Sequence, residues 1–240
     1  MPKVLEEWTV LPHGKLTHLA DDVMVVEGSI HMPVGEFPRR MTIVRLADGR
    51  LVIYSAIALD ETEMAALEAF GRPAFLIVPC DIHRMDAKIW KARYPALIVV
   101  APEGARKKVE DVVHVDAIEA DFGDPRVQLV TVPGTGGHEA ALLFRGPVDT
   151  TLEVNDLIAN LDDRPGFGGW LLRLAGFAGG EPRIPNVIDF KIVKDRDALR
   201  DQLEAWARID GLARIVVSHG AVVTNEPRRV LRELAATMDA

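Results

Sequence analysis

The chain has 240 residues, 48% of them hydrophobic and 27% charged, which is the composition of a globular protein large enough to bury a sizeable core. Its formal net charge of −8 argues against a nucleic-acid partner, because binding to phosphates requires a basic surface. The single cysteine, Cys80, excludes an intramolecular disulfide, and no stretch approaches the roughly 20 apolar residues of a membrane span, so a cytoplasmic protein without a membrane segment is expected.

The first predicted elements are β-strands. Residues 23–27 and 41–46 are rich in β-branched residues, and the second run alternates apolar with polar side chains. Asp48 and Gly49 then form a turn signal, after which the strand pattern resumes at 51–54. The two later runs are therefore predicted to pair as an antiparallel hairpin.

A helix and two buried strands are predicted next. Asp60 has the character of a helix N-cap, with Glu63 as its capping-box partner, and Gly71 is expected to end the helix. Continuous apolar runs at 74–78 and 96–100 are typical of strands that are covered on both faces. A shorter helix is predicted between these two strands.

The second half of the chain alternates strands with helices. Strands are predicted at 127–132, 140–144, 150–154 and 214–218, and helices at 195–209 and 227–238, the last capped by Asn225. The segment 162–186 is rich in glycine and proline and carries an apolar helical piece. Strands that cluster early and then alternate with helices predict a layered α/β sandwich, with helices outside packed sheets.

Histidine or aspartate side chains stand just after four of the predicted apolar strands. These residues are Asp81, His83, Asp86, His138, Asp156 and His219. Because ligands of α/β sheets bind at the carboxyl ends of strands, the six side chains are expected to converge on one pocket suited to a divalent metal. Glycines precede His138 and one follows His219, which allows the backbone to approach a buried centre closely.

Each of these residues also has a simpler interpretation. A histidine after a strand is more often a loop residue with a satisfied hydrogen bond than a metal ligand. Asp156 is suited to cap a turn, and Asp81 and Asp86 are suited to cap the helix that follows them. The combination of several strand ends, rather than any single residue, favours a functional site.

The order and spacing of these residues resemble the metallo-β-lactamase superfamily over most of the chain. Residues 81–86, Asp-Ile-His-Arg-Met-Asp, lie where that superfamily has a His-x-His-x-Asp-His motif. The loop that ends at His138, then Asp156 after a later strand, and finally His219 with its glycine match the remaining elements. The resemblance implies a single domain over residues 1–240 with a metallo-β-lactamase-like αββα sandwich fold, a metal centre and a hydrolytic activity.

More narrowly, the chain resembles a branch of that superfamily that is known only as a domain of unknown function. The residues that carry this likeness are 40–46, 52–55, 78–79 with His83, Trp90 with 94–96, and 152–157. Taken together, these segments are moderately specific to the branch. This narrower likeness implies no particular activity.

The first motif departs from the superfamily pattern. Asp81 and Asp86 stand where the pattern has histidines, and Met85 stands where it has a metal-binding aspartate, whereas a shift of one residue would bring Cys80 into the site. A thioether is a soft group and a poor ligand for a hard cation. The resemblance therefore implies a weakened centre that holds one ion at most, zinc, manganese or iron, with Asp86 and Asp156 as candidate catalytic residues.

Three functional hypotheses follow. The first is a metal-dependent hydrolase that acts on a small molecule. The second is a non-catalytic protein that keeps a remnant metal or ligand site, and the third is an iron-dependent redox protein. The segment 162–186 is expected to form a lid or hairpin near the site, or else a helix that packs on the domain or on a second subunit, which leaves a homo-oligomer open.

Overall fold

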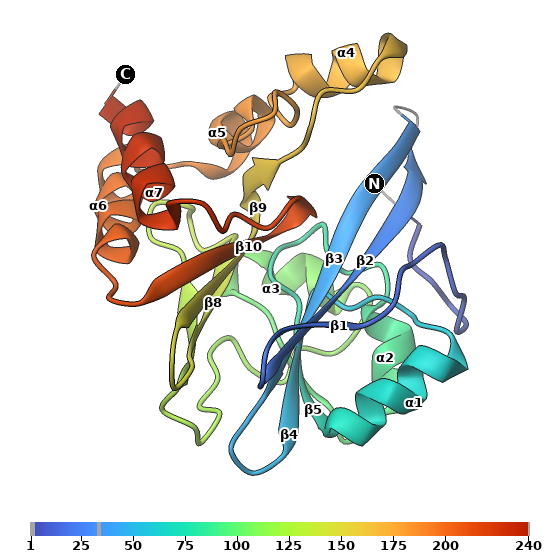
Figure 1. Ribbon diagram of the computed structural model, residues 1–240. Coiled ribbons are helices and arrows are strands. Elements are labelled where there is room, and N and C mark those ends of the chain that lie inside the picture. The colour runs from blue at the N-terminus through green and yellow to red at the C-terminus, as the bar shows by residue number, and fades with distance from the viewer. Residues whose placement is uncertain (1–2, 33–34, 240) are drawn as a thin grey trace.

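The computed structural model describes residues 3–32 and 35–239, in which two β-sheets pack face to face and helices cover their outer sides (Figure 1). The predicted αββα sandwich is confirmed. The domain limits predicted at residues 1 and 240 lie outside the described residues. No described helix combines the length and the apolar character needed to cross a membrane.

The first sheet has six strands in the order β1-β2-β3-β4-β5-β6. They are β1 (Thr17–Ala20), β2 (Val23–Met32), β3 (Gly35–Arg45), β4 (Arg50–Tyr54), β5 (Arg72–Ile77) and β6 (Ile98–Val100). The predicted hairpin forms, because β3 and β4 pair antiparallel with Arg45 opposite Leu51. β4, β5 and β6 run parallel to one another, in agreement with their continuous apolar sequences.

The second sheet has four strands in the order β10-β9-β8-β7. They are β7 (Val127–Thr131), β8 (Ala140–Arg145), β9 (Thr150–Asn160) and β10 (Leu212–Gly220). β9 and β10 are parallel, and β7, β8 and β9 are antiparallel neighbours. β9 therefore continues well beyond the strand end that the sequence predicted at Val154.

A register break between β9 and β10 positions one of the predicted site residues. Val154 pairs with Val217, and the pairing resumes where Ala159 lies opposite His219. β9 thus has four residues in a stretch where β10 has one, and Asp156 lies within this bulge. Because a bulge redirects the side chains of its strand, the break frees Asp156 from the regular alternation between the two sheet faces.

Helices cover the outer side of each sheet. The helices of the described residues are α1 (Glu61–Phe70), α2 (Ala87–Arg93), α3 (Glu103–Glu110), α4 (Gly166–Leu174), α5 (Asn186–Ile192), α6 (Arg196–Ala207) and α7 (Pro227–Ala236), followed by the short 3₁₀ helix η1 (Thr237–Asp239). α1, α2 and α3 pack on the first sheet, and α6 and α7 pack on the second. A third apolar cluster, which includes Val44 and Phe144, fills the space between the sheets.

Two of the predicted helix caps differ in the structure. Asp60 caps α1 by accepting hydrogen bonds from the backbone of Thr62 and Glu63, as predicted. The Glu63 carboxylate instead accepts a bond from the Leu16 backbone at 2.7 Å, so it anchors the N-terminal segment and does not close a capping box. α7 begins after Glu226, whose φ is 48°, so the predicted cap at Asn225 is wrong.

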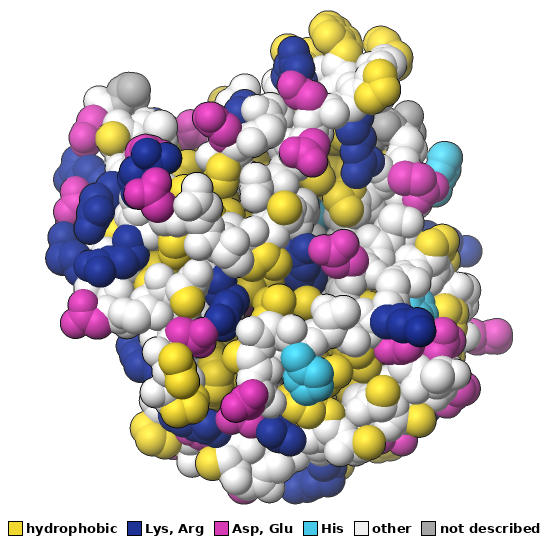
Figure 2. Space-filling view, viewed as in Figure 1, with side chains coloured by type: hydrophobic (Ala, Val, Ile, Leu, Met, Phe, Trp, Pro, Cys, Tyr) yellow, Lys and Arg dark blue, Asp and Glu magenta, His cyan; other side chains and the backbone are white. Residues whose placement is uncertain are grey.

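The glycine- and proline-rich segment forms α4 and α5, which extend from the end of β9 beside the body of the sandwich (Figure 1). Phe167, Trp170 and Leu174 of α4 are exposed by 74%, 56% and 63%. Figure 2 shows hydrophobic side chains at the top of the molecule, where α4 lies in Figure 1. Leu172, on the opposite side of the same helix, is buried. α4 therefore has one apolar side turned toward the domain and another turned toward solvent.

A buried carboxyl group joins the two sheets. Glu153 of β9 accepts a hydrogen bond from the Thr42 hydroxyl of β3 at 2.7 Å, and its other oxygen has no partner among the described residues. Burial raises the pKa of Glu153 to about 8, against the opposing effects of the Thr42 hydrogen bond and the Arg40 charge. The group is thus mostly protonated at neutral pH in the folded protein.

The raised pKa of Glu153 predicts a specific pH dependence of stability. The folded protein holds this proton up to about pH 8, whereas the unfolded chain releases it near pH 4.5. Proton binding by Glu153 therefore contributes its full share to the free energy of unfolding below pH 4.5, and this contribution is lost as the pH rises to 8. The free energy of unfolding falls by roughly 5 kcal/mol at most over this range. Relative to the wild type, Glu153→Gln should gain free energy of unfolding between pH 5 and pH 8.

Urea unfolding followed by circular dichroism at pH 5, 6.5 and 8 measures this difference. Glu181→Gln is the matched control, because Glu181 is exposed and its substitution should leave the pH profile unchanged. Parallel profiles for the wild type and Glu153→Gln would show that Glu153 does not titrate across this range.

Candidate metal centre

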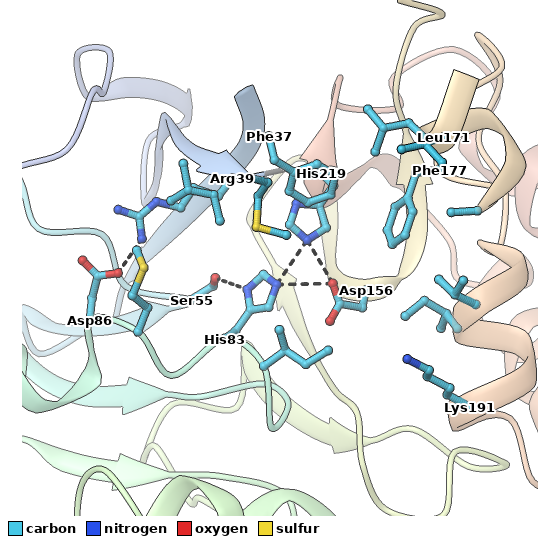
Figure 3. Close-up of a pocket in the computed structure, with 18 of the residues that line it drawn as sticks. Phe37, Arg39, Ser55, His83, Asp86, Asp156, Leu171, Phe177, Lys191 and His219 are labelled. Atoms are coloured by element: carbon cyan, nitrogen blue, oxygen red, sulfur yellow. Dashed lines mark hydrogen bonds and ion pairs between the residues drawn. The ribbon is translucent and has the colours of Figure 1, made fainter. Parts of the chain in front are cut away.

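Three of the predicted ligands meet at one point between the sheets (Figure 3). His83 follows β5, Asp156 lies in the β9 bulge, and His219 lies near the end of β10. His219 Nε2 is 2.9 Å from Asp156 Oδ1, and His83 Nε2 is 3.3 Å from the same oxygen and 3.2 Å from His219 Nε2. All three side chains are at least nine-tenths buried.

The orientation of His219 leaves a ring lone pair that faces a carboxylate. His219 Nδ1 lies 2.7 Å from the carbonyl oxygen of Pro38, which can only accept, so Nδ1 carries a proton. In the neutral ring, Nε2 then has a lone pair directed at Asp156 Oδ1. Two acceptors at this distance require a cation between them, either a second ring proton or a metal ion. A ligand histidine held by a backbone carbonyl is a common feature of metal sites.

His83 is also fixed through its second ring nitrogen. The Ser55 hydroxyl lies 2.7 Å from His83 Nδ1, which turns Nε2 toward His219 and Asp156. Ser55 follows β4 and has a φ of 56°, a left-handed conformation that is rare outside glycine. The surrounding structure imposes this conformation, and strained residues of this kind cluster at functional sites.

Cys80 supplies a further donor beside His83 and Asp156 that the main sequence hypothesis did not include. Its Sγ lies 3.2 Å from Asp156 Oδ2, and donor atoms of Cys80, His83 and Asp156 all lie within 4.8 Å of one another. The Asn155 amide donates to Cys80 Sγ at 3.2 Å, and the Ser218 hydroxyl donates to Asn155 at 2.8 Å. The thiol is therefore held in place on the inner side of the centre.

Burial and neighbouring charges shift the pKa values of the carboxyl and thiol groups at the centre. Burial alone would raise the pKa of Asp156, but the charge of His83 and the hydrogen bonds from His219 and His83 outweigh it and hold this pKa well below its usual range. Burial, reinforced by the Asp156 charge, raises the pKa of the Cys80 thiol. The same two causes raise the pKa of Glu139, which accepts a bond from the Leu157 backbone. Negative charge is thus concentrated on Asp156.

The donor set fits one divalent ion. In a tetrahedral site with bonds of about 2.0–2.3 Å, neighbouring ligand atoms lie about 3.3–3.7 Å apart. The separations among His83, Asp156 and His219 are 2.9–3.3 Å, close to that range. Two imidazoles and a carboxylate suit zinc, manganese or iron, and a thiolate from Cys80 would favour zinc or iron.

The other three predicted ligands do not join this cluster. Asp81 forms an ion pair with Lys108 at 2.8 Å. Asp86 is paired with Arg39 and accepts a bond from the Ala58 backbone at 2.9 Å, and Figure 3 shows this pair apart from the two histidines. Lys108 therefore satisfies Asp81, and Arg39 with the Ala58 backbone satisfies Asp86. Neither carboxylate lies within the group of His83, Asp156 and His219, although Asp86 lines the same cavity.

The Asp86 carboxyl group is almost completely buried beside Arg39. Burial raises its pKa, and the Arg39 charge opposes this rise. With one oxygen on Arg39 and the other on the Ala58 backbone, Asp86 is occupied in holding the loop before α2. The structure therefore gives no support to the expected catalytic role of Asp86.

His138 lies in the tight turn between β7 and β8, half-buried, and its backbone nitrogen donates to Thr135 at 3.2 Å. Among the described residues, neither His138 nor Asp81 lines the cavity beside the centre. The glycines near His138 serve the turn, because Gly134, Gly136 and Gly137 all have positive φ. The expected convergence thus holds for His83, Asp156 and His219, and Cys80 takes part in place of the remaining residues.

A cavity of about 310 Å³ opens onto the centre. His83, Asp156 and His219 form one part of its wall, and most of the rest is apolar. Phe37 and Phe177 lie against the His219 ring, with centroid distances of 4.6 and 6.2 Å. The cavity therefore places a largely apolar wall directly beside the polar cluster.

Solved structures of metallo-β-lactamases resemble this fold over nearly its full length. The FIM-1 enzyme of Pseudomonas aeruginosa in its mono-zinc form has a TM-score of 0.61 at 14% identity, over 95% of this chain and 96% of that one. DIM-1, in a structure of the enzyme exposed to ceftazidime, has a TM-score of 0.64 at 12% identity, over 95% and 99%. The enzyme of Hirschia baltica has a TM-score of 0.59 at 12% identity, over 93% and 98%.

These comparisons establish the fold. No protein-family model matches the sequence, and no curated protein is similar enough in sequence to count as a match. The chain therefore has the metallo-β-lactamase fold, with a Cys-His-Asp cluster at the place where its strand ends meet. The sequence signal for Cys80 was the shift of one residue in the first motif, whereas Ser55 was noted only as part of the segment 52–55 and was given no role at the site.

Metal content should separate the residues of the centre from the other predicted ligands. After mild loading with zinc, the wild type should bind about one ion per chain. His83→Ala and His219→Ala should lose most of this binding, because each removes a donor atom from the cluster. Asp81→Ala and His138→Ala are matched controls and should keep it. Elemental analysis of the desalted proteins gives the result, and the reverse pattern would place the ion elsewhere.

Cobalt substitution should show whether Cys80 binds the ion. A cobalt(II) thiolate bond gives an intense charge-transfer band in the near ultraviolet, and the wild type should show this band. Cys80→Ser should lose it while the weaker visible bands of the imidazole-bound ion remain. An identical ultraviolet spectrum in both proteins would exclude Cys80 as a ligand.

Proposed function

We propose that this protein is a metal-dependent hydrolase of a small molecule, with one ion held by His83, Asp156 and His219. The observation that carries the proposal is the convergence of His83 Nε2, His219 Nε2 and Asp156 Oδ1, which lie 2.9–3.3 Å from one another as the ligand atoms of a single ion do. The metallo-β-lactamase fold and the adjoining cavity support it. The single free cysteine, Cys80, suits a reducing compartment, so we also propose a cytoplasmic location.

The chemistry that a divalent ion supplies in such a site is polarisation of the attacked bond and activation of a water nucleophile. Asp156 remains ionised because His83 and His219 stabilise its charge, so it would bind the ion and orient a water molecule by accepting a hydrogen bond from it. Ser55 and the Pro38 carbonyl fix the two imidazole rings. The apolar cavity wall excludes bulk water from the substrate.

The site also supports a second candidate function. Two histidines and one carboxylate are the ligand set of many non-haem iron oxygenases. His83, His219 and Asp156 provide this set on one side of the cavity. Iron in the protein as purified, together with a visible absorption band that reduction bleaches, would favour this function over hydrolysis.

Hydrolysis should depend on the ion and on Asp156. Protein loaded with zinc, manganese or iron should hydrolyse members of a panel of chromogenic esters and thioesters, and chelation should abolish the activity. Asp156→Asn should lower kcat/KM by about 100-fold or more, because it removes the charge that holds the cation and the water. Steady-state rates measure the effect.

Asp162→Asn is the control for this experiment, since Asp162 is exposed just beyond the end of β9. It should retain wild-type rates. Equal turnover by the loaded and the metal-free protein would contradict the proposal. Metal binding without turnover of any ester or thioester would leave the non-catalytic hypothesis in its place.

A further inference from the structure

We infer that the molecule bound beside this centre is apolar and carries one anionic group, which Lys191 binds. The inference rests on the proposed function, because it concerns the substrate of the same site. It follows from three features of the cavity: its apolar wall, the pairing of Arg39, and the position of Lys191 opposite that pair.

The apolar wall of the cavity comes from segments that are far apart in the sequence. Its side chains include Met32 of β2, Phe37 of β3, Leu171 and Leu172 of α4, Phe177 after α4, and Ile188 of α5. Burial of apolar surface contributes about 25 cal/mol per Å², so such a wall binds hydrocarbon or aromatic groups. A strongly hydrated substrate, such as a free sugar, would leave its polar groups without partners there.

Two cationic side chains line the same cavity, and they differ in their partners. Arg39 is buried and forms an ion pair with Asp86, so its charge is largely neutralised. Lys191 makes no ion pair with a described residue. Its neighbour on α5, Asp189, is already held by Arg196 at 2.7 Å and does not compete for it.

The position of Lys191 places an anionic group near the reacting centre. Figure 3 shows its side chain projecting from α5 toward Asp156, while Arg39 and Asp86 lie on the far side of His83. The polar cluster lies between these two ends of the cavity. A substrate with its anionic group on Lys191 would present a neighbouring bond to the cluster, and its apolar part would lie against α4 and Phe37. Lys191 would also offset the repulsion between this anion and Asp156.

Binding of simple alkyl sulfonates tests the inference without requiring turnover. A sulfonate is a weak ligand for metal ions, so its affinity for the protein should depend on Lys191 and the apolar wall and only slightly on the ion. Calorimetric titration of the metal-loaded protein with octane-1-sulfonate should show saturable binding, which should be stronger than that of octan-1-ol. Affinity should rise about threefold for each methylene added from butane- to octane-sulfonate, because each methylene buries apolar surface in the cavity.

The dependence on charge is tested with variants of Lys191. Lys191→Ala should weaken octane-1-sulfonate binding by about fivefold, and Lys191→Glu should weaken it further. Lys107→Ala removes an equal charge from the exposed surface of α3 and should leave the affinity unchanged. Unchanged affinity in Lys191→Ala, or equal binding of octan-1-ol and the sulfonate, would overturn the inference.

These outcomes are distinguishable from failure of the proposed function. If the loaded protein hydrolyses neutral esters and Lys191→Ala binds octane-1-sulfonate with wild-type affinity, the hydrolase proposal stands and the substrate inference fails. If no ester or thioester is hydrolysed but sulfonate binding depends on Lys191, the cavity is a binding site for an apolar anion and the hydrolase proposal fails.

Discussion

The carboxylate of Asp156 is almost completely buried, and the surrounding residues are arranged to keep it charged. An isolated buried carboxylate is costly, so it requires close partners with positive charge or donor hydrogens. His83, His219 and Cys80 meet this requirement from separate segments of the chain. The bulge in β9 makes the arrangement possible, because a regular strand would alternate its side chains strictly between the core and the opposite face.

The same buried environment gives the site its chemical character. Electrostatic interactions strengthen where water is excluded, and the apolar cavity wall produces this condition beside the cluster. Asp86, a second carboxylate that lines the same cavity, is paired with an arginine and does not face the histidines. Asp86 forms an ion pair with Arg39 and accepts a hydrogen bond from the Ala58 backbone. Asp156 is therefore the carboxylate that faces both histidines.

The likeness to metallo-β-lactamases lies in the fold. At 11–14% identity, the sandwich still superimposes on solved metallo-β-lactamases over nearly the whole chain. At residues 80–81, however, Asp81 forms an ion pair with Lys108, and Cys80 lies in the cluster with His83 and Asp156. A fold that tolerates such changes supports many activities, so the chemistry of this protein has to be argued from its own donors and its own cavity.

The sequence by itself determined the elements and their layers. Strand alternation at 41–54, the continuous apolar run at 74–78 and the placement of His83, Asp156 and His219 after apolar strands were sufficient to predict an α/β sandwich with a polar site. These signals are local, because a strand repeats every two residues and a helix every 3.6.

Only the tertiary structure decided which polar groups face one another. The Arg39–Asp86 pair joins residues 47 positions apart, and the Cys80–Asp156 contact joins residues 76 positions apart. Neither contact leaves a trace in local periodicity, and a buried cysteine has the sequence signature of an ordinary core residue. The shift in register between β9 and β10 depends on how the two strands pack, and this packing brings Asp156 to His219.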